Sequence, residues 1–216
     1  MNINIEIPTS LEEITLSQYK RFLNIQKQTE ESHFLNAKAI EIFCDIDLKD
    51  VMRLKVADFN IITNKINLLF EQKPKLVQTF KLENTHYGFI PQLDDMTLGE
   101  YIDIDTYIGD WENMEKTMNV LYRPIVSKIK KRYAIKEYDV NTSDALLDMP
   151  LSAVLSSIFF LWNLGNDLSK TILKYLEAEQ GTNLMQSQTL TENGVGINQS
   201  TRYLTEILNG LKISLN

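Results

Sequence analysis

The sequence predicts a mainly α fold with small β-hairpin elements, an α+β class, built as a helical core with a C-terminal arm. Three observations predict this class. Apolar residues recur at spacings of three and four over several segments, which is typical of helices that bury one face. Among 216 residues only eight are glycine and five are proline, too few for a sandwich of strands with many tight turns. Two further segments have the strand-like composition of β-hairpins.

Residues 1–73 are predicted to form an N-terminal strand and a helical cluster. The strand-like run at 2–7 ends at Pro8, because proline cannot donate to a strand ladder. Helices follow wherever the helical spacing returns, and their expected ranges are 16–27, 34–43, 48–54 and 56–70. The single cysteine of the chain, Cys44, lies in an apolar stretch, which excludes an intrachain disulfide and favours a buried thiol in a reducing compartment.

Residues 74–180 are predicted to hold a β-hairpin, capped helices and a long core helix. The hairpin has its strands at 76–82 and 86–90, on either side of a short polar turn. The long helix is expected over 151–179, with a break near Gly165 as an alternative. A proline directly before this range suits a first helical turn.

A short, degenerate repeat marks two helix starts. Residues 7–19 (IPTSLEEITLSQY) return as residues 90–101 (IPQLDDMTLGEY), with one residue lost after the proline. Each copy follows a strand-like run and then supplies two carboxylates and a capping box. The capping residues are Thr15 with Gln18, and Thr97 with Glu100. The predicted unit is strand, turn and capped helix, which arises either from a duplicated, pseudo-symmetric lobe or from two independent uses of the same capping chemistry.

The helix expected after Asp110 carries the first candidate contact face. Asp110 can cap this helix, which should end before Pro124 because the residue before a proline disfavours helical backbone. One stripe of the helix is formed by Trp111, Met114, Met118 and Leu121. Methionine and tryptophan suit an adaptable partner-binding face, and packing in the core is the alternative.

A basic segment at 128–138 is the second candidate contact surface. Apolar and charged positions alternate over part of it, as they do along an exposed strand or hairpin edge. The basic candidates are Lys128, Lys130, Lys131 and Arg132. They form either a solvated edge that lysine protects from aggregation or a patch that binds phosphate or an acidic protein partner.

Residues 181–216 are predicted to be a flexible arm that ends in a docking helix. The stretch up to 200 is polar and rich in Thr, Asn, Gln and Gly. Helical spacing then returns in five apolar residues, Tyr203, Leu204, Ile207, Leu208 and Leu211. A short amphipathic helix after such an arm docks on a neighbouring subunit or back on its own domain.

Charge and motif content argue against several function classes. The net charge of −7 disfavours broad nucleic-acid binding, so any DNA contact is expected to be local and weak. The apolar run at 151–164 is too short for a membrane span, and the N-terminus has no secretory pattern. The acidic residues of the middle region do not follow the spacing of a calcium loop. They are Asp94, Asp95, Glu100, Asp103, Asp105 and Asp110. We therefore predict no catalytic residue, no metal and no cofactor, and we do not expect an enzyme.

One part of the chain resembles a known family. Residues 89–103, together with Trp111, Met114 and residues 120–125, are similar to small proteins encoded by tailed phages of Bacteroidetes, including crAss-like phages. The resemblance implies a virion protein of the capsid, portal or tail, either structural or packaged as cargo and ejected with the genome. It implies an oligomer in the particle, contacts with portal, capsid or tail subunits, and a passage through the host cytoplasm during assembly. The alternative is an assembly chaperone or scaffolding factor that is absent from the finished particle.

Overall fold

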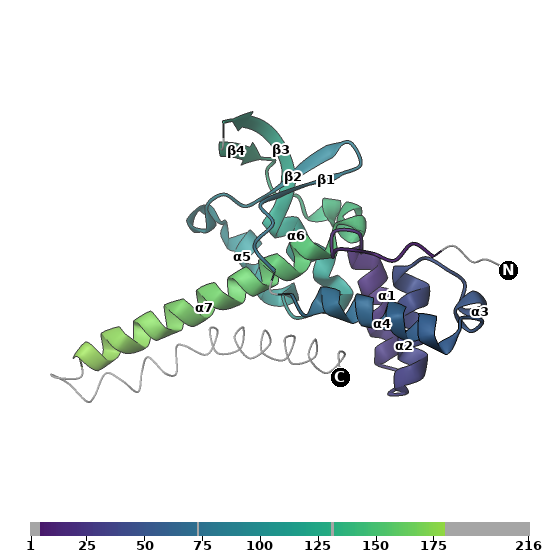
Figure 1. Cartoon of the computed structure of the whole chain (residues 1–216). Coiled ribbons are helices and arrows are strands. Elements are labelled where there is room, and N and C mark those ends of the chain that lie inside the picture. Colours follow the sequence, from purple (N-terminus) through teal and green to yellow (C-terminus); the bar gives the residue numbers. More distant parts are fainter. Residues whose placement is uncertain (1–4, 73, 131, 180–216) are drawn as a thin grey trace.

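The structure, a computed structural model, describes residues 5–72, 74–130 and 132–179. Over these ranges the chain forms helices and a four-stranded antiparallel sheet, so the predicted α+β class is confirmed. Figure 1 shows a helical cluster made by the N-terminal residues, the sheet above it, and one long helix that extends away from both.

The helical cluster contains four helices close to the predicted ranges. They are α1 (Leu16–Gln26), α2 (Ser32–Phe43), α3 (Leu48–Val51) and α4 (Val56–Phe70). Aromatic side chains hold the cluster together: the ring of Phe43 lies 5.4 Å from that of Phe22 and 5.9 Å from that of Phe70, centroid to centroid. Such contacts stabilise a core beyond the area they bury.

The strand expected at 2–7 is not formed over its described part. Residues 5–7 have no regular secondary structure, although Ile5 and Ile7 pack against the core. A strand needs a neighbour to satisfy its backbone groups, and this segment pairs with neither edge of the sheet. The strand-like composition of this segment therefore reflects apolar side chains that pack against the core, without pairing of its backbone in the sheet.

The sheet consists of two hairpins in the order β1-β2-β3-β4. Its strands are β1 (Thr79–Leu82), β2 (Thr85–Phe89), β3 (Tyr122–Ile129) and β4 (Arg132–Ile135). The first hairpin was predicted, although its first strand is shorter than the expected 76–82 and its second is shifted by one residue from the expected 86–90. The middle pair joins segments far apart in sequence, with Phe89 opposite Tyr122 and Tyr87 opposite Pro124.

Between the hairpins the chain forms helices that lie beneath the sheet (Figure 1). They are η1 (Leu93–Asp95), α5 (Leu98–Tyr107), η2 (Trp111–Asn113) and α6 (Met114–Leu121). As predicted, the Asp110 side chain caps this last stretch by accepting from Glu112 N at 2.9 Å. A 3-10 segment, η3 (Val140–Asp148), follows the sheet.

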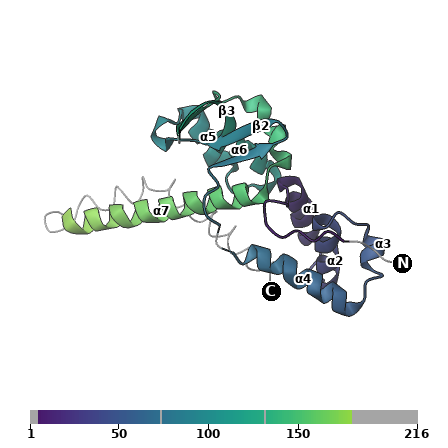
Figure 2. The same cartoon turned by 45° about the horizontal axis from the view of Figure 1, so that its top comes forward.

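The long helix α7 (Leu151–Glu179) begins in the core and leaves it (Figure 2). Its first turns are buried, whereas Leu164 and Leu168 are about half exposed. The helix continues through Gly165, so the break considered there is not present. Backbone hydrogen bonds from Leu16 N to Met149 O (3.0 Å) and from Leu151 N to Ile14 O (2.8 Å) join its start to the N-terminal cluster.

Both predicted capping boxes are present, but the two repeat copies lie in different environments. The side chains of Thr15 and Thr97 each accept the backbone N–H of the residue three positions later. The side chain of that residue in turn accepts the backbone N–H of the threonine. Leu16 is buried whereas its counterpart Leu98 is 75% exposed, and Tyr19 is 2% exposed whereas Tyr101 is 57% exposed. Pseudo-symmetric lobes would bury equivalent positions alike, so the structure favours two independent uses of one capping motif.

Candidate functional site

The basic segment predicted from the sequence forms the exposed edge hairpin of the sheet. We define the basic hairpin by its exposed large apolar and cationic side chains, which are Val126, Lys128, Ile129, Lys130 and Arg132. None of its three described cations forms an ion pair with another residue of the described ranges. Val126 is 64% and Ile129 is 76% exposed, so the hairpin presents two large apolar side chains to solvent. Lys131, also predicted for this surface, lies outside the described residues.

The base of the basic hairpin is held firmly. The Tyr133 hydroxyl donates to the carbonyl of Phe89 at 2.8 Å and to that of Gln78 at 3.2 Å. Its ring lies over Gly88, the position in β2 where a side chain would not fit. The strand register shifts between Ile125 and Ser127, which is the kind of irregularity that bends a strand. The structure thus fixes the base of the hairpin and leaves its apolar and basic tip in solvent.

The methionine stripe predicted as a partner-binding face belongs to the core. Met114 and Met118 are fully buried, so the prediction of a contact surface is wrong for both, and the core alternative is right. The reason is the position of α6, which lies beneath the sheet with all of its residues but Lys116 buried. Trp111 is half-buried and packs edge-on against Tyr19, with ring centroids 5.0 Å apart.

The third predicted surface lies outside the described residues. Its members are Tyr203, Leu204, Ile207, Leu208 and Leu211.

A further exposed face, on α5, was missed by the sequence reasoning. Leu98, Tyr101 and Ile102 are 75%, 57% and 51% exposed and share one side of the helix, since they are three and four positions apart. Asp94 and Asp95 of η1, directly before this helix, are exposed and form no ion pair with a described residue. We call these five residues the α5 face. Its spacing was visible in the sequence, but nothing there showed that this side of α5 is left uncovered.

Other carboxylates of the acidic region have structural partners. Glu100 is buried, and its Oε1 lies 2.8 Å from Nη1 of Arg123 in an ion pair that is almost fully covered. The carboxylate of Asp103 accepts a hydrogen bond from the hydroxyl of Tyr138. The pKa of this hydroxyl is raised, mainly by burial and to a smaller extent by the carboxylate. Within the described ranges, no group of three or more acidic, histidine or cysteine side chains is placed to hold a metal ion.

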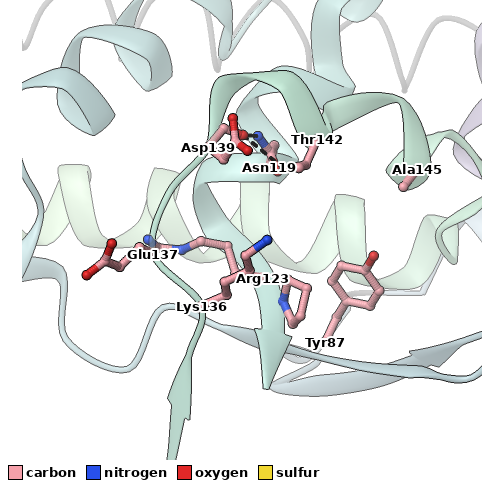
Figure 3. A pocket seen from close by; sticks show the side chains of 9 residues that line it. Tyr87, Asn119, Arg123, Lys136, Glu137, Asp139, Thr142 and Ala145 are labelled. Atoms are coloured by element: carbon pink, nitrogen blue, oxygen red, sulfur yellow. Dashed lines mark hydrogen bonds between the residues drawn. The ribbon is translucent and has the colours of Figure 1, made fainter. Parts of the chain in front are cut away.

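A shallow cavity of about 160 Å³ lies between β3 and the start of η3 (Figure 3). Arg123 and Lys136 line it together with the carboxylates of Glu137 and Asp139, so that charges of both signs meet there. The side-chain amide of Asn119 donates to the backbone carbonyl of Asp139 (2.8 Å) and accepts from the hydroxyl of Thr142 (2.9 Å). These hydrogen bonds fix Asn119 and Thr142, whereas Nε of Arg123 is buried without a hydrogen-bond partner in the described ranges. No cysteine, serine or histidine lines this cavity.

Cys44 is buried as predicted. Burial raises the pKa of its thiol to about 11, so the thiolate needed for nucleophilic chemistry is scarce at neutral pH.

Comparisons with protein-family models, with curated proteins and with solved structures find no match to this chain. Among the helices in the described ranges, none has the length and apolar character needed to cross a membrane. We therefore identify candidate functional surfaces from the exposure and charge of this chain's own residues. They are the basic hairpin and the α5 face.

Proposed function

We propose that this chain is a phage virion protein of the capsid, portal or tail, structural or packaged as cargo, that acts through protein contacts. The observation that carries the proposal is the resemblance of residues 89–103, with Trp111, Met114 and residues 120–125, to virion proteins of tailed phages. In the structure these segments build α5, α6 and the start of β3, which are joined by the buried pair Glu100–Arg123. The likeness thus concerns residues that form one packed unit.

The exposed surfaces support the contact role. The basic hairpin and the α5 face each combine large apolar side chains with charges that form no ion pair within the described ranges, a composition that suits protein interfaces. A net charge of −7 disfavours close association with packaged DNA, so protein neighbours are the expected partners.

Mass spectrometry of purified, nuclease-treated particles tests the proposal, with copy number measured against the portal. We expect the chain in the particle, at a fixed symmetric number if it is structural and at a larger, irregular number if it is cargo. Particles of a phage lacking the gene, mixed with lysate that contains the protein and purified in parallel, control for adsorption. Absence from washed particles would overturn the proposal and favour an assembly chaperone or scaffolding factor.

A further inference from the structure

The α5 face and the basic hairpin are complementary in charge. The α5 face presents Leu98, Tyr101 and Ile102 beside the carboxylates of Asp94 and Asp95. The basic hairpin presents apolar and cationic side chains together, namely Val126 and Ile129 with Lys128, Lys130 and Arg132. Each surface therefore combines exposed apolar side chains with charges, and the charges of the two surfaces have opposite signs.

Within the described residues, neither surface is covered by the rest of the chain. The apolar residues of both keep half or more of their surface in solvent, so the two surfaces do not cover one another. No ion pair within the described residues neutralises the two carboxylates or the three cations. Removing such apolar surface from water favours a complex, and opposite charges steer its formation.

The segment that follows the basic hairpin contacts the helix that carries the α5 face. Tyr138, three residues beyond β4, donates to Asp103 of α5 at 2.5 Å. Two copies related by a two-fold axis can make the same contact twice, because in such an interface each surface meets its complement on the other copy.

We propose that the basic hairpin of one copy docks on the α5 face of a second copy of this chain. The hairpin apolar residues cover the exposed side of α5, and its cations lie against Asp94 and Asp95. This inference concerns self-association, and it stands or falls independently of the phage assignment.

Charge exchange between the two surfaces tests the proposal, with sedimentation velocity of the purified full-length chain as the measurement. One variant carries Lys128→Glu and Arg132→Glu, and the other carries Asp94→Lys and Asp95→Lys. We expect the wild-type chain to associate at low salt, each variant alone to remain monomeric, and an equimolar mixture of the two variants to associate again. All substituted positions are exposed, and far-ultraviolet circular dichroism checks that each variant is folded.

A matched control is Lys65→Glu, which removes an exposed lysine from α4 and should leave association unchanged. A wild-type chain that is monomeric at every concentration would overturn the proposal, as would a mixture of variants that stays monomeric. Since this experiment uses the isolated protein, its failure leaves the particle measurement unaffected, and absence from the particle leaves this result unaffected.

Discussion

Gln18 and Glu100 occupy the same position in two capping boxes, yet they have different tertiary partners. Each side chain accepts the backbone N–H of its cap threonine, at 2.9 Å for Gln18 and 2.7 Å for Glu100. Gln18 then donates to the carbonyl of Ile42, whereas Glu100 holds the guanidinium of Arg123. The residue at this one position thus caps a helix and also sets what the first turn contacts, and only the glutamate of the second copy is paired with a buried cation.

The Glu100–Arg123 pair yields a prediction about stability. Arg123→Met leaves the Glu100 carboxylate buried without its counter-charge, so the free energy of unfolding should fall by about 3–5 kcal/mol. Adding Glu100→Gln should recover most of this loss, because glutamine keeps the cap, as Gln18 does in α1. Urea unfolding of the wild type, the single variant and the double variant measures both effects. A double variant as unstable as Arg123→Met would show that the uncompensated charge is not the cause.

At the scale of elements, glycines in β2 and in α7 have opposite surroundings. A Cβ at Gly88 would lie 2.5 Å from Cε2 of Tyr133, whereas a Cβ at Gly165 would meet nothing within 4 Å. The Tyr133 ring cannot easily move away, because its hydroxyl bonds two carbonyls at the edge of the sheet. The attachment of the basic hairpin to the rest of the sheet therefore depends on the absence of a side chain at one position.

We predict opposite effects for alanine at these two glycines. Gly88→Ala should lower the free energy of unfolding by about 1–3 kcal/mol, because the added methyl group overpacks the contact with Tyr133. Gly165→Ala should raise it by about 0.5–1 kcal/mol where α7 unfolds with the core, because alanine restricts the unfolded chain more than glycine does. Thermal and urea unfolding of both variants provide the comparison. Similar effects of the two substitutions would contradict the contact geometry.

At the scale of the whole molecule, buried tyrosines connect its parts. Tyr19 lies among the aromatic rings of the helical cluster and of Trp111. The Tyr122 hydroxyl donates to the carbonyl of Val77 at 2.7 Å and to that of Ala153 at 3.3 Å, so it joins the segment before β1 to α7. Burial raises the pKa of both hydroxyls above the ordinary value of 10.0.

These raised pKa values predict a loss of stability at alkaline pH. The pKa of each phenol is 10.0 in the unfolded chain and higher in the folded protein. The protonated phenol therefore contributes its full stabilisation below pH 10.0, and this contribution is lost as the pH rises through the pKa of the folded state. The urea midpoint should therefore fall as the pH increases above about 10, with tyrosinate absorbance appearing only on unfolding. Tyr19→Phe should reduce this dependence. Tyr122→Phe should also lower stability at neutral pH, by about 1 kcal/mol for each lost hydrogen bond. A urea midpoint that stays constant across this range would contradict the prediction.

Local signals in the sequence predicted most elements of the fold. These signals act over a few residues, so the sequence shows them directly. They include the capping boxes at Thr15 and Thr97, the proline before α7 and the polar turn between β1 and β2. The basic segment was likewise predicted as an exposed hairpin edge, because alternation and lysine content are local properties. The shorter β1, the shifted β2 and the shorter α3 differ from the predictions only at their ends.

By itself, the sequence determined where helices begin, which segments form hairpins and that the lone cysteine is buried. Only the tertiary structure decided which side of each element faces solvent. Leu16 and Leu98 follow identical caps, yet one is buried and the other exposed, and Met118 lies in the core although its residue type also suits a contact face. The physical reason is that capping and turn formation are satisfied within a few residues. Burial instead depends on which distant segments pack together, as when α6 is enclosed beneath the sheet while one side of α5 is left open.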